Sequence, residues 1–363
     1  MTEYIRNDEK IIFNLRSLYE RYGYSQYKMT KFEEYDLYVR NKDFLSSKNI
    51  ITFTDTNGRL LALKPDVTLS IIKNNRNNHN RLQKVYYNEN VYRVSKGSDS
   101  FKEIMQAGLE CIGDVDCYCL GEVLSLAAKS LKSISSDSVL CVSDIDIISG
   151  VIDSVQISSE VRHGILRLIG EKNTHELYAL CTENNIDSQT LELLIQLTGI
   201  HGNTDDVLPK IKQLLPDITE VLKFEKILCS LTDEIKSMIE IDFSVMGDTK
   251  YYNGIVFRGF ISSVPESVLS GGQYDKLMSK MNQNTGAVGF AVYLDLLERL
   301  NEEYAEYDVD TVLLYDENDN MHALNEAIEK LSESSAVLAV KEIPEKIKFR
   351  QLMKFDGREA EII

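Results

Sequence analysis

The chain has 363 residues, with 57 acidic and 40 basic side chains, a net charge of −17 and an isoelectric point near 4.9. This balance argues against a large nucleic-acid surface, because phosphate binding requires clustered Lys and Arg. No apolar run approaches the roughly 20 residues of a membrane-spanning helix, and the start, MTEYIRNDEKIIF, lacks the apolar core of a signal peptide. We therefore expect a soluble, cytoplasmic protein without a nucleic-acid or membrane partner.

The cysteines and histidines give no sign of a metal site. Cys117 and Cys119 are separated by a single residue, unlike the spacing of a zinc knuckle, and no two histidines stand at ligand spacing. The sequence thus predicts reduced structural cysteines, no metal and no cofactor.

The first part of the chain predicts a mixture of helices and strands. Apolar residues at helical spacing predict a helix over 8–22, and a turn with a strand follows. Residues 50–63 predict a hairpin whose turn is Asp55 to Gly58, and a helix begins near Val67 after Pro65. The remaining elements expected here are antiparallel strands at 84–96 and 102–114, a helix at 118–133 and a strand at 138–144.

The second part begins with helical periodicity over about 150–237, which predicts a helical insertion. Strand character returns at 241–262. The later expectations are a glycine turn entering a helix (267–281), a strand or turn running into a long helix (287–303), a strand (312–315), a helix (321–332), a strand (336–340) and a short basic piece.

These elements predict an α+β fold, in which an antiparallel sheet is flanked by helices and followed by a small α/β tail. We expect one domain over 1–305, which contains the helical insertion, and a shortened C-terminal α/β domain over 306–363.

Polar residues recur on one of the predicted strands. Gln106 and Glu110 are four residues apart, so they share a face with Gly108 between them, and the glycine leaves room for a ligand. The alternative, and the commoner explanation for such a segment taken alone, is the exposed face of an antiparallel sheet. Asp66 also has two explanations, because an acid at a strand-to-helix turn either caps the helix or binds a ligand.

A tyrosine pair, Tyr251 and Tyr252, stands at the entrance of the strand in MGDTKYYNGIVFRGF (246–260) and could hold a small planar ligand. Adjacent strand residues point to opposite sides, so we expect at most one of the two to face a given site. Alone, SGGQYD (270–275) indicates only tight packing.

Taken in order, LALKPDVT, VYR…MQAGLECIG, YYNGIVF, SGGQYD and AVGFAVYLDLL resemble the class II aminoacyl-tRNA synthetase domain of the histidyl-tRNA synthetase family. The resemblance covers roughly residues 5–305. It implies a six-stranded antiparallel sheet flanked by helices and a dimer formed through the first motif.

The segments depart from that family where it binds ATP. Gly247 stands where the family has the arginine of Arg-Gly-Leu-Asp-Tyr-Tyr, Val94 replaces the acid of motif 2, and Leu296 replaces the arginine of motif 3. Tyr293 replaces a motif 3 glycine, and Thr30 the usual proline of motif 1. The resemblance with these departures implies that ATP activation is lost.

The residues that match the family's histidine site are retained. Asp66 and Gln106 match the groups that hold the α-amino group, and Glu110 and Tyr252 match those that hold the imidazole. With Tyr251 and Arg93, they form the histidine-binding site that the resemblance implies. Because the family's arginine is absent, Arg93, Lys250 or a backbone N–H must bind the carboxylate.

A synthetase-like chain with an amino-acid site but no ATP chemistry resembles the family of ATP phosphoribosyltransferase regulatory subunits. That resemblance implies a non-catalytic role in histidine biosynthesis, a short-form catalytic subunit as partner, L-histidine as effector, and a homodimer within a hetero-oligomer. The alternatives are a histidine–tRNA ligase of unusual sequence and an orphan class II synthetase paralogue.

Overall fold

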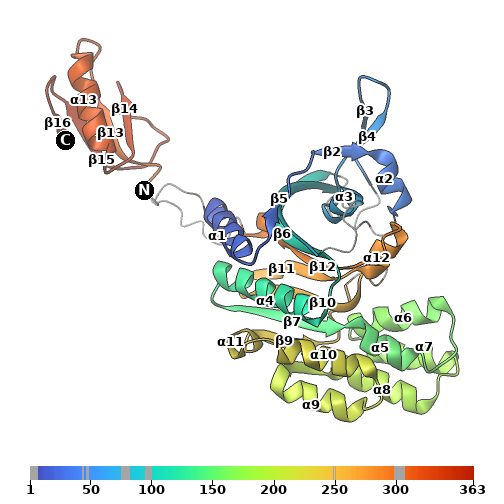
Figure 1. Cartoon of the computed structure of the whole chain (residues 1–363). Coiled ribbons are helices and arrows are strands. Elements are labelled where there is room, and N and C mark those ends of the chain that lie inside the picture. Colours follow the sequence, from blue (N-terminus) through green and yellow to red (C-terminus); the bar gives the residue numbers. More distant parts are fainter. Residues whose placement is uncertain are drawn as a thin grey trace. The chain divides into compact units, whose positions relative to one another are not determined.

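The computed structural model (Figure 1) describes residues 7–42, 45, 49–74, 82–94, 100–247, 249, 251–297 and 307–363. The chain divides into two compact units, Met1–Glu298 and Arg299–Ile363. Each unit has a sheet and a core of its own.

The first unit is built on a nine-stranded sheet, of which the six middle strands are antiparallel, as expected. At its edges, β1 runs parallel to β5 and β9 parallel to β7, while β8 is antiparallel to β9. In spatial order the strands are β1 (Ser25–Gln26), β5 (Gln83–Val94), β6 (Phe101–Gly113), β12 (Gly286–Tyr293), β11 (Val264–Gln273), β10 (Asn253–Ile261), β7 (Ser138–Asp144), β9 (Ile239–Asp242) and β8 (His201–Asn203).

Helices α1 (Asn7–Arg21) and α4 (Cys117–Ile134) cover one face of this sheet. The expected apolar stripe of α1 packs inward, with Leu15 and Tyr19 fully buried. Tyr19 meets Phe290 of β12 edge to face, and Leu131 of α4 lies against Gly259 of β10. Aromatic and aliphatic packing therefore closes this side of the sheet.

The opposite face carries a second core, formed with α3 (Thr68–Asn74), α12 (Asp275–Lys280) and α2 (Tyr35–Arg40). A three-stranded sheet, β2 (Phe32–Glu34), β4 (Leu60–Leu63) and β3 (Thr52–Thr54), lies beside it. The predicted hairpin is confirmed, and Gly58 adopts the left-handed conformation of its turn, with φ of 78°. The polar residues named above lie on this second face.

The helical insertion consists of α5 (Ile145–Ile152), α6 (Ser159–Gly170), α7 (Thr174–Glu183), α8 (Ser188–Gly199), α9 (Thr204–Leu214), α10 (Thr219–Cys229) and α11 (Asp233–Lys236), as Figure 1 shows. Helices α6 to α9 each follow a capping residue whose side chain accepts a backbone N–H of the first turn: Ser158, Asn173, Asp187 and Asn203. The prediction of helices throughout this region missed the strand β8, because a strand of three residues is too short to show an alternating pattern.

The second unit has a four-stranded sheet in the order β14 (Val337–Val340), β13 (Val309–Leu314), β15 (Phe349–Phe355) and β16 (Ala360–Ile362), with α13 (Met321–Ser332) packed on it. The expected strand, helix and strand are confirmed. The basic piece after them is in fact β15 and β16. The alternation is hidden because polar Gln351 lies on the face of Met353 and Phe355, and apolar Leu352 lies on the face of Arg350 and Lys354.

The glycine turn expected at SGGQ was wrong, because Ser270 to Gln273 continue β11. A side chain on Gly271 would place its Cβ 2.4 Å from the Gly289 carbonyl oxygen, and one on Gly272 would place it 2.8 Å from the Tyr252 ring. The glycines serve close packing within a strand. β12 ends in a single turn of 3₁₀ helix, η2 (Leu294–Leu296), and the rest of the long helix expected there falls mainly on 298–306, outside the described residues.

Candidate functional site

The floor of the site is made by the second face of β6, β12 and β11. Glu110 is paired with Gly289, Gly108 with Ala291, and Gln106 with Tyr293, so these pairs form three successive rows across β6 and β12. Alternate residues of a strand share a face, and the rows are therefore about 7 Å apart. Small residues occupy the middle of this floor.

Glu110 lies at one end of the floor and is only 2% exposed. Thr68 of α3 donates a hydrogen bond of 2.7 Å to its Oε1, and the Tyr274 hydroxyl donates one of 2.6 Å to its Oε2. Burial raises the pKa of Glu110 to about 8, although both hydroxyls oppose this shift by stabilising the carboxylate. Each oxygen keeps a further lone pair for a ligand N–H.

Close packing fixes where the Glu110 side chain can lie. A Cβ on Gly289 would stand 1.7 Å from Glu110 Oε2, and a Cβ on Gly108 would stand 2.3 Å from the Phe290 carbonyl oxygen and 2.5 Å from the Tyr87 hydroxyl. The expectation that Gly108 leaves room above the sheet was therefore wrong, because Tyr87 fills that space. Gly289 provides the room for Glu110 instead.

Asp66 lies at the start of α3 and has the capping role that was weighed from the sequence. Its Oδ1 accepts the Leu69 backbone N–H at 2.9 Å, which caps the helix, and its Oδ2 lies 3.8 Å from Arg93 Nη2. Arg93 Nε donates to the Pro65 carbonyl at 2.8 Å. Burial raises the pKa of Asp66, and Arg93 opposes that shift.

Both tyrosines of the pair reach the same place, contrary to expectation. β10 begins at Asn253, so Tyr251 and Tyr252 precede the strand and do not alternate across it. Their ring centroids are 4.7 Å apart at 61°, and Tyr251 also lies 5.7 Å from the Tyr274 ring. Burial, followed by Asp66 and Glu110 among the nearby groups, raises the pKa of Tyr251 well above its usual range.

The structure thus brings the predicted residues to one region of the second face, which we call the tyrosine site: Asp66, Arg93, Gln106, Glu110, Tyr251 and Tyr252. Gln106 and Glu110 are 3% and 2% exposed, so the alternative of a solvent-exposed sheet face is wrong. Sequence reasoning missed Thr68 and Tyr274, although both lie within the motifs LALKPDVT and SGGQYD.

Gly247 lies beside this site in the left-handed conformation, with φ of 58°, and a Cβ there would be 2.8 Å from the Tyr252 ring. An arginine at this position would strain the backbone and displace the tyrosine. Lys250, a second candidate for binding a carboxylate, lies outside the described residues.

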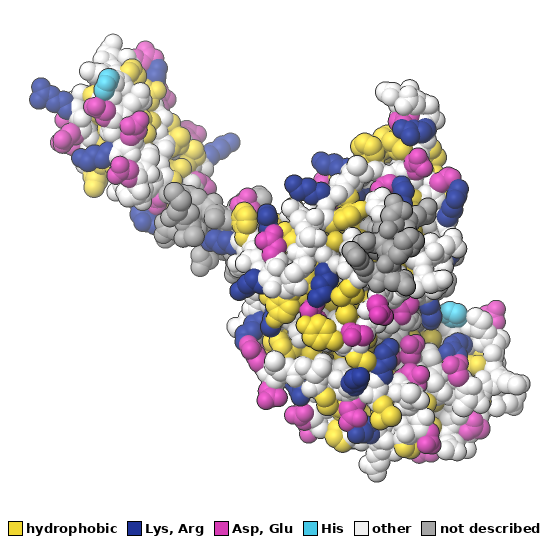
Figure 2. All heavy atoms as spheres, in the orientation of Figure 1, with side chains coloured by type: hydrophobic (Ala, Val, Ile, Leu, Met, Phe, Trp, Pro, Cys, Tyr) yellow, Lys and Arg dark blue, Asp and Glu magenta, His cyan; other side chains and the backbone are white. Residues whose placement is uncertain are grey.

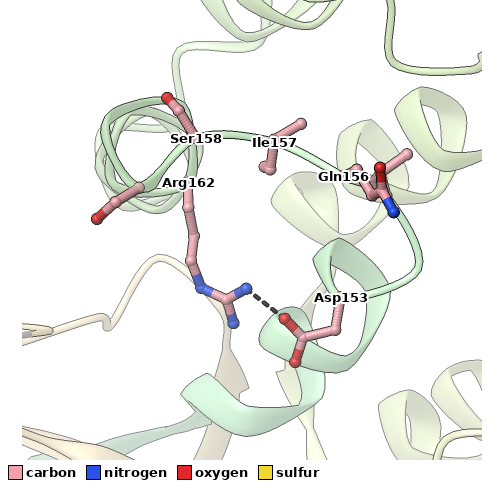
Figure 3. A pocket seen from close by; sticks show the side chains of 7 residues that line it. Asp153, Gln156, Ile157, Ser158 and Arg162 are labelled. Carbon is pink, nitrogen blue, oxygen red and sulfur yellow. Dashed lines mark hydrogen bonds and ion pairs between the residues drawn. The ribbon is translucent and has the colours of Figure 1, made fainter.

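A hollow in the helical insertion is distinct from the tyrosine site. It is an open depression of about 660 Å³ between the end of α5 and the start of α6, where Asp153 and Arg162 form an ion pair (Figure 3). In the part of the chain that the structure describes, no group of His, Cys, Asp and Glu could hold a metal ion, and no helix is both long and apolar enough to cross a membrane.

Fold and site together define a class II aminoacyl-tRNA synthetase-like domain, with an antiparallel six-stranded centre and a polar site on one face. The family model described as histidyl-tRNA synthetase matches residues 2–297, and the chain belongs to this family.

Individual relatives agree with this assignment. An ATP phosphoribosyltransferase regulatory subunit of Ruminiclostridium cellulolyticum is 25% identical over 333 residues, which are 87% of this chain and 79% of the relative. A histidine–tRNA ligase of Methanocaldococcus jannaschii is 27% identical over 306 residues, covering 83% of this chain and 73% of the ligase.

Solved structures show the same fold. A Bacillus halodurans protein titled ATP phosphoribosyltransferase regulatory subunit/histidyl-tRNA synthetase has a TM-score of 0.79 at 21% identity and covers 96% of this chain and 93% of its own. A chain of the ATP phosphoribosyl transferase (HisG:HisZ) complex from Thermotoga maritima has a TM-score of 0.60 at 19% identity, covering 79% and 97%.

The buried carboxyl of Glu110 makes a testable contribution to stability. Its pKa is raised from 4.5 to about 8 on folding, so between these pH values the folded protein holds a proton that the unfolded chain has released. The free energy of unfolding therefore falls as pH rises from about 4.5 to about 8. Glu110→Gln should flatten this dependence in denaturation curves at pH 5, 6.5 and 8. A matched change at exposed Glu266, Glu266→Gln, should keep the wild-type slope. An equally steep slope in Glu110→Gln would contradict the assignment.

Proposed function

We propose that this chain is a non-catalytic regulatory subunit of ATP phosphoribosyltransferase, needed for the activity of a short catalytic subunit and mediating its feedback inhibition by histidine. The observation that carries the proposal is the composition of the tyrosine site. It contains groups that suit a zwitterion and an imidazole. The arginines expected for ATP chemistry are absent, because Gly247 and Leu296 stand at their positions. The relatives named as regulatory subunits support the same role.

The charge pattern suits the head group of an amino acid. Asp66 and Arg93 present opposite charges 3.8 Å apart, each on a side chain less than one-fifth exposed. An α-amino group needs acceptors, which Asp66 and Gln106 provide, and a carboxylate suits the guanidinium of Arg93. In this arrangement Arg93 binds the carboxylate in place of the family's arginine, whose position is occupied by Gly247.

The other end of the floor suits an imidazole. Glu110 offers a lone pair on each oxygen beyond those used by Thr68 and Tyr274, and a ring N–H can donate to one of them. Tyr251, Tyr252 and Tyr274 surround this end with aromatic rings. A planar ring bound against aromatic faces gains packing energy in addition to its hydrogen bonds.

Regulation follows if histidine binds one state of the assembled enzyme more tightly than the other. Tighter binding to the inhibited state shifts the complex toward that state by the ratio of the two affinities. The chain then needs no catalytic chemistry of its own.

The homodimer that we propose within the complex has a suitable surface next to the first motif. Phe32 of β2 and Phe53 of β3 are 45% and 38% exposed, with ring centroids 5.5 Å apart. Figure 2 shows hydrophobic side chains gathered at the base of the β3–β4 hairpin. Glu34 and Arg59 supply both signs of charge beside the rings, as a self-complementary two-fold contact requires.

A histidine–tRNA ligase is the second candidate, favoured by the similarity to the Methanocaldococcus jannaschii enzyme. Against it stand the absent arginines, since each group that stabilises transition-state charge contributes about 3–4 kcal/mol.

We predict no histidine-dependent exchange between ATP and pyrophosphate, because Gly247, Val94 and Leu296 replace the groups on which this reaction depends. The purified chain should match a buffer blank, with an active histidine–tRNA ligase as positive control. Robust exchange would establish the ligase alternative.

We predict that the chain is a dimer that co-elutes with a short-form ATP phosphoribosyltransferase catalytic subunit. Replacing Phe32 and Phe53 by Ser should weaken the dimer about tenfold or more, since buried aromatic residues dominate interfaces. Light scattering after size exclusion measures this, and Leu222→Ser in the insertion, where Leu222 is 58% exposed, is the matched control. A monomeric wild-type chain that does not bind the catalytic subunit would refute the assembly.

We predict that L-histidine binds at the tyrosine site and that Glu110→Ala weakens it roughly 30-fold, because the imidazole loses a buried hydrogen-bond partner. Tyr252→Phe reports on the hydroxyl at the same end. Calorimetry measures the affinities, and exposed Glu266→Ala is the control. The Glu110→Ala variant should still assemble but resist feedback. Unchanged affinity in Glu110→Ala would place histidine elsewhere.

A further inference from the structure

Tyr293 occupies the end of the floor opposite Glu110. It is the last residue of β12 and is paired with Gln106 of β6, whereas Glu110 is paired with Gly289 four residues earlier on β12. Between these rows β6, β12 and β11 carry only small side chains, namely Gly108, Ala291 and Ser270, while the Tyr87 side chain of β5 reaches over Gly108. Tyr293 is therefore a large side chain that follows a run of small ones.

A hydrogen bond fixes the direction of the Tyr293 ring. Its hydroxyl lies 2.6 Å from Ser270 Oγ on β11, so the side chain leans from β12 across the neighbouring strand on the same face. Burial raises the pKa values of Tyr87 and Tyr252, and Tyr293 adds a smaller electrostatic contribution to both shifts. The ring is half-buried, as expected for a residue that borders a site.

We propose that Tyr293, held by Ser270, forms the end wall of the tyrosine site at the head-group end and restricts the site to an α-amino acid whose carboxyl group is free. The inference rests on the proposed function in one respect, namely that Gln106, Asp66 and Arg93 take the head group and Glu110 takes the side chain. A ligand that is extended at its carboxyl group, such as a bulky ester or amide, then meets the tyrosine ring.

The Ser270 hydroxyl gives the wall its rigidity. A tyrosine ring without that partner could rotate away from an extended ligand, whereas the short contact to β11 holds it across the floor. Ala291, one row earlier on β12, cannot replace it as a barrier, because its side chain is only a methyl group.

The test uses calorimetry with L-histidine, its methyl ester and its benzyl ester. Both esters lack the negative charge of the free carboxylate, so the loss of that charge cancels from the ratio of their affinities, which reports the effect of the added phenyl ring. The wild-type protein should bind the benzyl ester about tenfold or more weakly than the methyl ester, since forcing extra bulk against a packed wall is unfavourable. In Tyr293→Ala the two esters should bind within about threefold of each other.

Tyr293→Phe keeps the ring but loses its hydrogen bond to Ser270, so its ester ratio should lie between those of the wild type and Tyr293→Ala. Tyr293→Leu, which keeps apolar bulk at the strand but lacks the distal ring, should change the ratio in the same direction as Tyr293→Ala if the latter does not fold. Failure of the wild-type chain to bind L-histidine would overturn the proposed function and this inference together. Histidine binding with the same ester ratio in the wild type, Tyr293→Ala and Tyr293→Leu would overturn the inference alone.

Discussion

The buried carboxyl group of Glu110 is the constraint on which the rest of the site depends. A carboxylate so far from water is unfavourable unless hydrogen-bond donors surround it, and Thr68 and Tyr274 provide them from α3 and from the end of β11. Gly289 must be a glycine to leave the carboxyl its place. Four separate parts of the chain are thus held together by one side chain, which makes this end of the site rigid before any ligand arrives.

The opposite end of the site is organised by charge. Arg93 binds the Pro65 carbonyl and lies near Asp66, so the turn that begins α3 is fastened to the end of β5. Asp66 in turn caps the helix that carries Thr68. Asp66 and Arg93 are therefore linked to Glu110 through the first turn of α3.

Much of the fold and the residues of the site were predictable from sequence. Alternation identified β7 and β10, apolar spacing identified α1 and α13, and the ordered motifs indicated the synthetase-like fold, which the structure confirms. The motifs also named Asp66, Gln106 and Glu110, because their chemical type and spacing are local properties of the chain. Conformation was less predictable where local signals are ambiguous. The glycines of SGGQ suit a turn as well as a crowded strand, and only their neighbours decide between these.

The sequence by itself determined which chemical groups the site contains, and that glycine and leucine stand at positions 247 and 296. Only the tertiary structure decided how those groups are used. Thr68 and Tyr274 meet at Glu110 although they stand 42 and 164 residues from it. Tyr251 and Tyr252 share one site because β10 begins after them, and Tyr87 fills the space above Gly108. Periodicity encodes which side of an element is buried, whereas partners across a sheet depend on strand order and register, which no local pattern records.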